Sequence, residues 1–330
     1  MNTSCIIRGM GHCVPETVLT NADFERMVET NDEWIVSRTG IRERHVALNG
    51  ETCVDLCHEA SVKALAHAGI AADELTHVLV ATFSADAVIP SAACMLSHRL
   101  GISGRMAMDL SAACSGFLYA LETARALLLL HPEAKILVAS CDIVSSRVDY
   151  TNRTTCVLFG DGAGAVVLTA DSPELRGGRV LDVLVASDGA MGDLLTIKGG
   201  GSGTPYKLGE TIRSDFFVEM NGREVYKHAV RAMSGVCQEL MTRHGYTCAD
   251  VDVFIPHQAN LRIVEAVGKR LNMPEEKVFT NLQKYGNTSA ASVPLALSEA
   301  VAENVIKPGS LVLMGTFGGG FTWGSALVRF

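Results

Sequence analysis

The feature that most constrains this chain is an expected strand-to-helix elbow with a cysteine at its tip. The apolar run Met106–Leu110 predicts a buried strand, and the apolar stripe from about Ser115 to Leu130 predicts a helix. Cys114 lies between them among small residues. Free backbone N–H groups and the helix macrodipole at such a position favour thiolate over thiol. We therefore expect Cys114 to be a nucleophile, and the alternative is a buried, inert cysteine.

Composition limits the classes of function that remain. The 330 residues are 48% hydrophobic, which is enough for one large core or two fused ones, and the net charge of -8 argues against general nucleic-acid binding. Ten scattered cysteines without a C-x-x-C pair predict reduced thiols in a cytoplasmic protein. Cys53, Cys57 and His58 resemble half of a metal site, but no second half has ligand spacing, so we expect no metal. We also expect neither a signal peptide nor a membrane span.

The expected elements of the first half recur in the second. Each half has a helix, a strand, a second strand that runs into a turn, and a second helix. In the first half the four ranges are 52–68, 77–83, 106–110 and 115–130. In the second half they are 222–244, 251–256, 278–282 and 288–304. His77 precedes Cys114 by 37 residues, and Val251 precedes Asn287 by 36. Although generic α/β patterns can coincide, this repeat predicts two fused copies, 1–171 and 172–330. It also predicts a mixed, largely parallel sheet with helices on both faces.

The repeat predicts where three candidate site residues lie in the fold. If a pseudo-twofold axis relates the copies, Cys114 and Asn287 occupy equivalent helix N-termini that face one another. His257 follows the expected strand 251–256, and residues at the carboxyl ends of such strands line ligand crevices. Taken singly, His257 is more often structural and Asn287 more often a helix cap. We further expect the basic stretch Arg38–His45 to be exposed.

At these residues the chain resembles β-ketoacyl-acyl-carrier-protein synthase III. Ala-Ala-Cys-Ser-Gly-Phe around Cys114, His-Gln-Ala-Asn at His257 and Gly-Asn-Thr-Ser at Asn287 match that family's catalytic triad. Further matches along nearly the whole chain are Asp32–Ile35, Arg38–Ile41, Phe159–Gly164 and Gly318–Gly324. The resemblance implies the thiolase fold, an α/β architecture of five α-β-α-β-α layers built from two duplicated halves, and a homodimer. The segment Thr196–Glu210 departs from the family pattern and looks longer and looser.

The resemblance also implies an activity, that of an acyltransferase that starts fatty acid synthesis. Such an enzyme condenses a short acyl-CoA, here acetyl-CoA by expectation, with malonyl-acyl-carrier protein and releases CO₂. Cys114 carries the acyl group, and the N–H groups of Cys114 and Gly319 form the oxyanion hole. His257 and Asn287 donate hydrogen bonds to the enolate. Coenzyme A thioester is a substrate, and no cofactor is implied.

The remaining site residues also come from the resemblance. Trp34 and Arg153 are expected to flank the adenine of CoA, with Thr30 and Arg38 along its entry tunnel. For the acidic carrier protein we expect a basic dock, and a plain solvated helix face is the alternative; the dock residues are Arg262, Lys269, Arg270 and Lys227. Ile89, in the loop Ala85–Pro90, is expected to close the acyl pocket of the partner subunit.

Two other functions stay open at this point. A related condensing enzyme of secondary metabolism would keep the three catalytic residues and use another acyl acceptor. A non-catalytic module that binds acyl-CoA or a carrier protein would need no nucleophile, so the combination of Cys114, His257 and Asn287 disfavours it.

Overall fold

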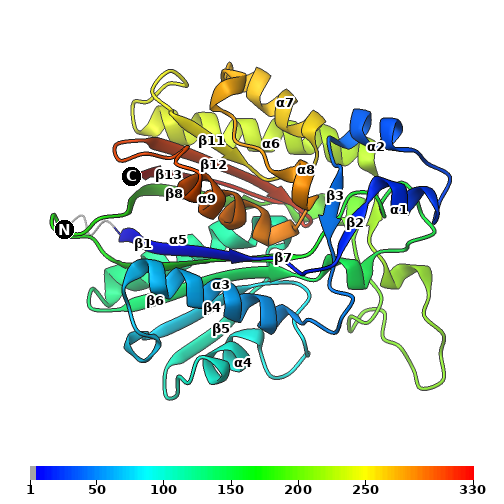
Figure 1. The fold of residues 1–330 in the computed structure, drawn as a ribbon, viewed down its shortest axis with the longest axis horizontal. Helices are drawn as coiled ribbons and strands as arrows, with labels where there is room; N and C mark the ends of the chain where they lie inside the picture. Colours follow the sequence, from blue (N-terminus) through cyan, green and yellow to red (C-terminus); the bar gives the residue numbers. More distant parts are fainter. Residues whose placement is uncertain (1–4) are drawn as a thin grey trace.

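A computed structural model describes residues 5–330, and its main sheet has nine strands in the order β11-β12-β13-β8-β1-β7-β6-β4-β5 (Figure 1). The strands of this sheet are β1 (Cys5–Cys13), β4 (His77–Ala81), β5 (Met106–Leu110), β6 (Lys135–Asp142), β7 (Gly162–Ala170), β8 (Gly178–Ser187), β11 (Val253–Pro256), β12 (Leu311–Gly318) and β13 (Thr322–Arg329). Two small hairpin-like sheets pair β2 (Val18–Thr20) with β3 (Glu43–His45) and β9 (Leu195–Thr196) with β10 (Glu219–Met220).

The helices are α1 (Asn21–Glu25), α2 (Asp32–Thr39), α3 (Cys53–Ala68), α4 (Ala92–Arg99), α5 (Gly116–Leu130), α6 (Gly222–Arg243), α7 (Leu261–Leu271), α8 (Leu282–Tyr285) and α9 (Ser292–Ala302). Several begin at the capping residues that the sequence offers. The Thr52 side chain accepts from Asp55 N at the start of α3, and the Asn260 side chain accepts from Ile263 N at the start of α7. These caps satisfy backbone donors that have no partner inside the helix.

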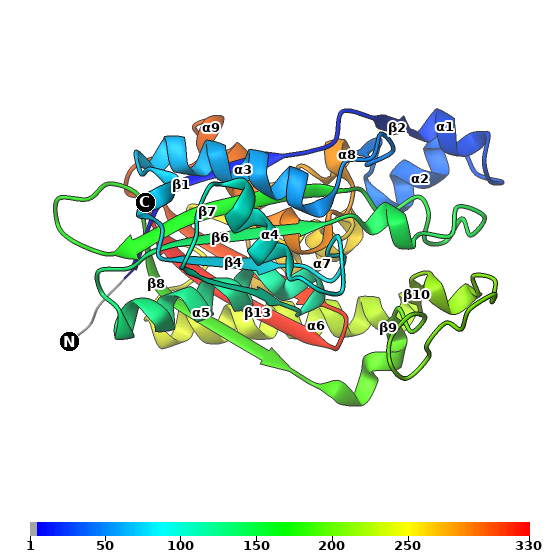
Figure 2. The same ribbon diagram turned by 90° about the horizontal axis from the view of Figure 1, so that it is seen from below.

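The expected five layers are present. Only a short pairing of Cys5–Ile7 with Gly178–Val180 joins the two halves of the sheet, which then face one another. Helices α5 and α9 fill the space between them, α3 and α4 cover the outer face of the first half, and α6 and α7 cover the other side (Figures 1 and 2). The architecture is therefore the thiolase fold. The expected boundary between residues 171 and 172 falls between β7 and β8, and this division stays a prediction.

Helix α5 is the apolar centre of the molecule. By length and composition, Ala113–Leu130 is the one segment among residues 5–330 that could cross a membrane. Half of this segment is buried inside the protein, where α5 packs against β4, β6 and β8. Its Leu118, Leu121 and Ala124 belong to the central apolar cluster. Its composition is thus that of a core helix.

Several expectations about the sheet are corrected. Of its eight neighbouring strand pairs only three, β11/β12, β4/β5 and β4/β6, are parallel, so the sheet is not largely parallel. Residues 278–282 form no strand: Val278 makes a single bridge to Phe254, and Asn281 N donates to the Gln258 side chain instead of a neighbouring strand. Strand β8 was not foreseen. Met106 begins an edge strand and is 42% exposed, so β5 is not buried in this chain.

The basic stretch Arg38–His45 is not uniformly exposed. Arg44 is completely buried, and its guanidinium donates to Asn21 Oδ1 at 2.8 Å and to Val157 O at 2.5 Å. It also lies over the Phe24 ring. Burial lowers the pKa of Arg44 to about 10, which still leaves it charged at neutral pH. Arg44 therefore ties the N-terminal segment to the loop before β7.

The segment Thr196–Glu210 extends from β9 as a long excursion (Figure 2). Its base is organised rather than loose, because Lys198 N and Gly199 N both donate to Asp215 O. Arg213 pairs with Glu210 and Asp215 and stacks over the Tyr206 ring. That the segment is longer than is usual in the family stays a prediction, and polar contacts fix its two ends.

Candidate functional site

Cys114 lies on a strand-to-helix elbow, as the sequence predicts, and the elbow is strained. A 3-10 turn over Ala113–Ser115 joins β5 to α5, and Ala113 has φ 46°, a left-handed value that costs a non-glycine residue about 1–2 kcal/mol. Strain of this kind is common at functional sites. The backbone of Gly318 passes directly beside the cysteine, and a Cβ there would lie 2.7 Å from Cys114 N. Glycine is thus required where the two halves meet.

A second elbow of the same form faces the first. A 3-10 turn over Ser289–Ala291 precedes α9, and Ser289 has φ 53°. Ala113 and Ser289 are thus the matching positions of the two halves, so the counterpart of Cys114 is Ala290. The expected equivalence of Cys114 with Asn287 is wrong by three residues. Asn287 still reaches the site, from the loop before the elbow.

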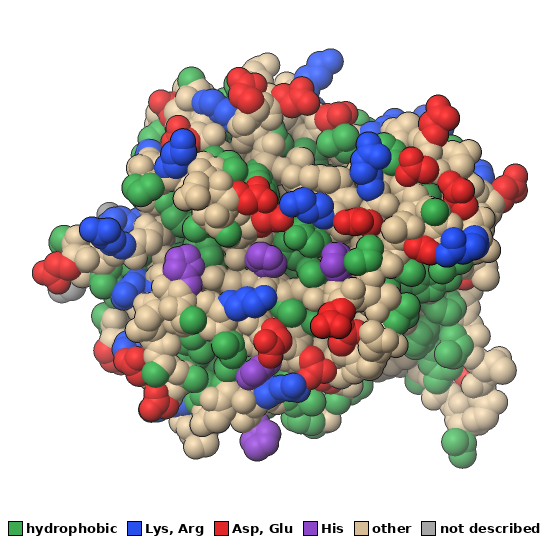
Figure 3. Space-filling view, in the orientation of Figure 1, with side chains coloured by type: hydrophobic (Ala, Val, Ile, Leu, Met, Phe, Trp, Pro, Cys, Tyr) green, Lys and Arg blue, Asp and Glu red, His purple; other side chains and the backbone are tan. Residues whose placement is uncertain are grey.

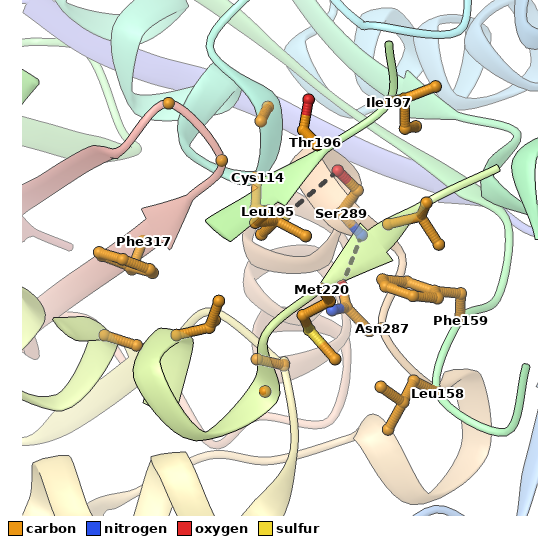
Figure 4. Close-up of a pocket in the computed structure, with 18 of the residues that line it drawn as sticks. Cys114, Leu158, Phe159, Leu195, Thr196, Ile197, Met220, Asn287, Ser289 and Phe317 are labelled. Atoms are coloured by element: carbon orange, nitrogen blue, oxygen red, sulfur yellow. Dashed lines mark hydrogen bonds between the residues drawn. The ribbon is translucent and has the colours of Figure 1, made fainter. Parts of the chain in front are cut away.

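The side chain of Asn287 is held in one orientation. Its Oδ1 accepts from Ser289 N at 2.9 Å, and the Ser289 hydroxyl lies 3.4 Å from Cys114 Sγ (Figure 4). Because Oδ1 accepts this hydrogen bond, the amide N–H groups of Asn287 are the part of the side chain that can donate to a substrate. The glycine stretch 159–164 supports this loop: Gly160 N donates to Asn287 O, and a Cβ at Gly160 would lie 2.3 Å from Tyr285 O.

His257 follows β11 and is almost completely buried. Its Nδ1 lies 2.6 Å from Ser292 Oγ. Burial lowers the pKa of His257 to about 4, so the ring is neutral near pH 7. When the Ser292 hydroxyl donates to Nδ1, the single ring proton is on Nε2.

Cys114 differs from the expectation of a stabilised thiolate. Burial raises the pKa of its thiol to about 12; the hydrogen bond with Ser289 opposes this rise, and the carboxylate of Asp142 adds to it. Desolvation by burial is the largest of these effects on the pKa of the thiol. The thiol is neutral at pH 7 and needs a proton acceptor to become a nucleophile.

The three residues line one cavity of about 1200 Å³. Of the expected site residues, this cavity also contains Arg38, Lys227, Arg262 and Gly319 in its lining. Apolar walls come from Phe159, Leu195 and Met220, which lie around Cys114 and Asn287 in Figure 4. Gly199, Gly200 and Gly201 show that the long segment after β9 also lines the cavity. The remaining expected residues lie outside the lining: Thr30, Trp34, Arg153, Lys269, Arg270 and Ile89.

The expected CoA residues gather around Trp34. The guanidinium carbon of Arg153 lies 5.2 Å from the centre of the indole ring, and that of Arg38 lies 5.9 Å away. Since Arg153 already covers the ring, an adenine enters between them only if this side chain moves. The Thr30 hydroxyl is buried without a hydrogen-bond partner among the described residues.

The four expected docking residues are exposed on two adjacent helices, α6 and α7. Lys227 pairs with Glu224, and Arg262 lies over the Tyr226 ring. Lys269 and Arg270 are in the last turn of α7. On the face in Figure 3, basic and acidic side chains are interspersed.

The half-site of Cys53 and Cys57 gains a third thiol in the fold. The sulfur atoms of Cys53, Cys57 and Cys141 lie within 4.8 Å of one another, whereas His58 pairs with Glu59 outside this group. All three cysteines are buried in the apolar cluster beneath α3. The absence of a metal stays a prediction.

Three residues of the site were not foreseen: Ser289, Ser292 and Asp142. Ser289 stands in the quoted stretch Gly-Asn-Thr-Ser, and Ser292 follows it by three residues, so the proximity of Ser289 to the site was visible in the sequence. Asp142 ends β6, and the rule that strand ends line the crevice could have found it.

Comparisons with known proteins agree along the whole chain. Residues 108–189 match the family model described as 3-oxoacyl-[acyl-carrier-protein (ACP)] synthase III, and residues 241–330 match that of its C terminal. The β-ketoacyl-[acyl-carrier-protein] synthase III of Oleidesulfovibrio alaskensis is 56% identical over 329 residues, covering 100% of both chains. That of Nitratidesulfovibrio vulgaris is 54% identical over 331 residues, with the same coverage.

Solved structures give the same result. The crystal structure of 3-oxoacyl-[acyl-carrier-protein] synthase III from Aquifex aeolicus superposes with a TM-score of 0.90 at 42% identity, covering 99% of this chain and 100% of that one. The layered fold and the cysteine elbow define a thiolase-fold condensing enzyme, an acyltransferase. The chain belongs to the β-ketoacyl-[acyl-carrier-protein] synthase III family.

Proposed function

We propose that this protein condenses a short acyl-CoA, preferably acetyl-CoA, with malonyl-acyl-carrier protein, and so starts fatty acid synthesis in the cytoplasm. The observation that carries the proposal is the convergence of Cys114, His257 and Asn287 on one cavity. Relatives at up to 56% identity bear the name of this activity. Each step uses groups of the chain and of the substrates, so the proposal includes no metal or redox cofactor.

In the first half-reaction, Cys114 takes the acyl group. Its sulfur attacks the thioester carbon of acyl-CoA, and CoA leaves. The N–H groups of Cys114 and Gly319 stabilise the oxyanion of the tetrahedral intermediate. The close approach of the glycine loop to Cys114 supports this pairing.

In the second half-reaction, malonyl-acyl-carrier protein loses CO₂, and its enolate attacks the acyl group on Cys114. The charge develops on the thioester oxygen, which requires hydrogen-bond donors. Neutral His257 supplies Nε2–H because Ser292 occupies Nδ1. Asn287 supplies an amide N–H because its Oδ1 is held by Ser289 N. Neither donor changes its protonation state near pH 7.

Coenzyme A reaches Cys114 along the cavity wall that contains Arg38. Arg38 and Arg153 present guanidinium groups suited to the phosphates, and Trp34 offers a stacking face for adenine. Thr30 is also proposed to lie along the entry tunnel, and its hydroxyl has no hydrogen-bond partner among the described residues.

A homodimer is part of the proposal. Among residues 5–330, strand β5 pairs only with β4, so its other edge is open for pairing with a second copy. Val88 and Ile89 are 99% and 85% exposed, which is unusual for adjacent apolar residues unless a partner covers them. Ile89 also lies outside the cavity of its own chain, as a residue that enters the partner's cavity must.

The size of Ile89 is expected to set the length of the acyl group. Burial of a CH₂ group gains about 0.8 kcal/mol, whereas overfilling a packed pocket costs ~1–3 kcal/mol. We expect the wild type to use acetyl to butyryl groups, Ile89→Phe to narrow the range toward acetyl, and Ile89→Ala to admit longer chains. Acylation rates with acyl-CoAs of increasing length measure this. The role of Ile89 is contradicted if the wild type prefers decanoyl-CoA or longer acyl-CoAs. It is also contradicted if both variants keep the chain-length profile of the wild type.

Carrier-protein docking is expected at Arg262 and Lys227, with Lys269 and Arg270 further along α7. Arg262→Glu should raise KM for malonyl-acyl-carrier protein by about tenfold and leave acylation by acetyl-CoA nearly unchanged, because a docking charge acts mainly on encounter. The control is Lys307→Glu, which makes the same change of charge. Lys307 precedes the first residue of β12, at the end of that strand opposite to Gly318. If malonyl-CoA and the carrier-bound substrate lose equally, Arg262 belongs to a shared tunnel and not to a dock.

Mass spectrometry tests the proposed function directly. Incubation with acetyl-CoA should place an acetyl group on the peptide that contains Cys114, and malonyl-acyl-carrier protein should then remove it as a 3-oxoacyl product. An adduct that only another acceptor removes favours a condensing enzyme of secondary metabolism. A folded protein that binds acetyl-CoA without an adduct is a binding module.

A further inference from the structure

A buried carboxylate lies behind the nucleophile. Asp142, the last residue of β6, is completely buried, and the nearby Ser289 side chain lowers the pKa of its carboxylate, against the effect of burial. The same Ser289 hydroxyl lies 3.4 Å from Cys114 Sγ. The Ser289 hydroxyl therefore acts on both the sulfur and the carboxylate, and the condensation steps above use neither Ser289 Oγ nor Asp142.

The two oxygens of Asp142 have different surroundings. Oδ1 accepts from Phe83 N at 2.9 Å and from the hydroxyls of Thr82 and Ser84 at 3.1 and 3.3 Å. Oδ2 accepts one backbone bond, a long one of 3.3 Å from Ala290 N. No ion pair to Asp142 is found among residues 5–330. Oδ1 is therefore fully occupied, whereas Oδ2, next to the Ser289–Ala290 elbow, has room for a proton.

We propose that Ser289 and Asp142 form a proton relay that activates Cys114 for acyl transfer. This inference rests on the proposed function and adds the group that accepts the thiol proton. Ser289 touches the reacting sulfur and is a catalytic residue, while Asp142 acts through it.

The protons balance over a full cycle. In acylation, Cys114 S–H passes its proton to Ser289 Oγ, and the Ser289 proton moves to Asp142 Oδ2. The new C–S bond forms, the C–S bond to CoA breaks, and the CoA thiolate takes a proton from solvent. In condensation, the C–C bond forms and Cys114 leaves as a thiolate, which recovers the stored proton through Ser289. One solvent proton is consumed per cycle, as decarboxylation of a malonyl carboxylate requires.

The acidities of the buried groups fit this direction of transfer. Burial raises the pKa of Asp142 to about 7, partly opposed by its hydrogen bonds, whereas burial lowers the pKa of His257 to about 4. Asp142 is therefore the stronger base of the two near neutral pH. The other titratable groups that act on Asp142, or on which it acts, are Cys53 and Cys57 from α3 and Cys114 itself.

The test measures the reactivity of Cys114 with and without the relay. Iodoacetamide alkylation of the Cys114 peptide and its acylation by acetyl-CoA are followed by mass spectrometry from pH 5.5 to pH 9. Because the carboxylate form accepts the proton, both wild-type rates should rise through about pH 7 and then level. Ser289→Ala and Asp142→Asn should each be about 10²-fold slower at pH 7.5 and should lose this inflection.

A third variant separates the relay from packing. Thr82→Val keeps the side-chain shape but removes one donor to Oδ1, so it should raise the pKa of Asp142 and move the inflection upward with the plateau unchanged. If Asp142→Asn does not fold, Ser289→Ala and Thr82→Val decide the question. The relay is overturned if Ser289→Ala or Asp142→Asn reacts with the rates and the pH profile of the wild type. It is also overturned if Thr82→Val does not move the inflection. Wild-type protein that is alkylated with this profile but never acetylated contradicts the proposed function and leaves the relay standing.

Discussion

Cys114→Ser is expected to lose acetyl transfer from acetyl-CoA by on the order of 10⁴-fold or more. The exchange of sulfur for oxygen keeps the shape of the elbow. It replaces an ionisable thiol with a hydroxyl that hardly ionises at neutral pH. Ionisation at this position is already unfavourable for a thiol, because burial raises the pKa of Cys114 to about 12. Mass spectrometry of the peptide that contains residue 114 after incubation with acetyl-CoA measures the loss.

The matched control for this substitution is Cys94→Ser. Cys94 is exposed on α4 and is also a free thiol, so its loss should leave the acetyl adduct on Cys114 unchanged. Circular dichroism confirms that both variants are folded. Acetylation of the Cys114→Ser protein at a rate near that of the wild type would mean that another group of the chain is the first acyl acceptor.

The elbow could be predicted because its signal is local. Met106–Leu110 and the stripe from Ser115 to Leu130 have the lengths and periods of a strand and a helix, and the structure has β5 and α5 there. The repeat then indicated that a second helix start would face Cys114. Its register could not be read from spacing alone, since a loop residue can reach the same space as an elbow residue. Asn287 does so from three residues before the position that matches Cys114.

Burial produced the other differences between expectation and structure. A charged stretch suggests exposure, yet the fold supplies Asn21 and the Val157 carbonyl as partners for Arg44, so its guanidinium is buried. The start of a helix at Cys114 was visible in the sequence, but the desolvation that raises the pKa of its thiol depends on how closely the two halves pack. Strand β8 was not foreseen, because its residues do not alternate between apolar and polar, and its pairing with β1 joins the two halves.

His257→Ala and Asn287→Ala are expected to retain acetylation of Cys114 and to lose condensation by about 10²–10³-fold each. Each variant removes one donor to the enolate oxygen, and neither donor takes part in the attack on acetyl-CoA. Single-turnover acetylation and the chase with malonyl-acyl-carrier protein measure the two half-reactions separately. Asn49→Ala, a substitution of an exposed asparagine outside the cavity lining, should change neither rate.

A second substitution at Asn287 separates the lost donor from a disturbed elbow. In Asn287→Ala, the buried Ser289 N–H loses its acceptor, which costs about 1–3 kcal/mol of stability and can move the Ser289 hydroxyl away from Cys114. Asn287→Asp keeps an oxygen for Ser289 N but has no N–H to offer. We therefore expect Asn287→Asp to condense as poorly as Asn287→Ala. If His257→Ala and Asn287→Asp are folded and both fail to take up acetyl groups, the two residues act in acyl transfer as well, and the proposed division between the half-reactions is wrong.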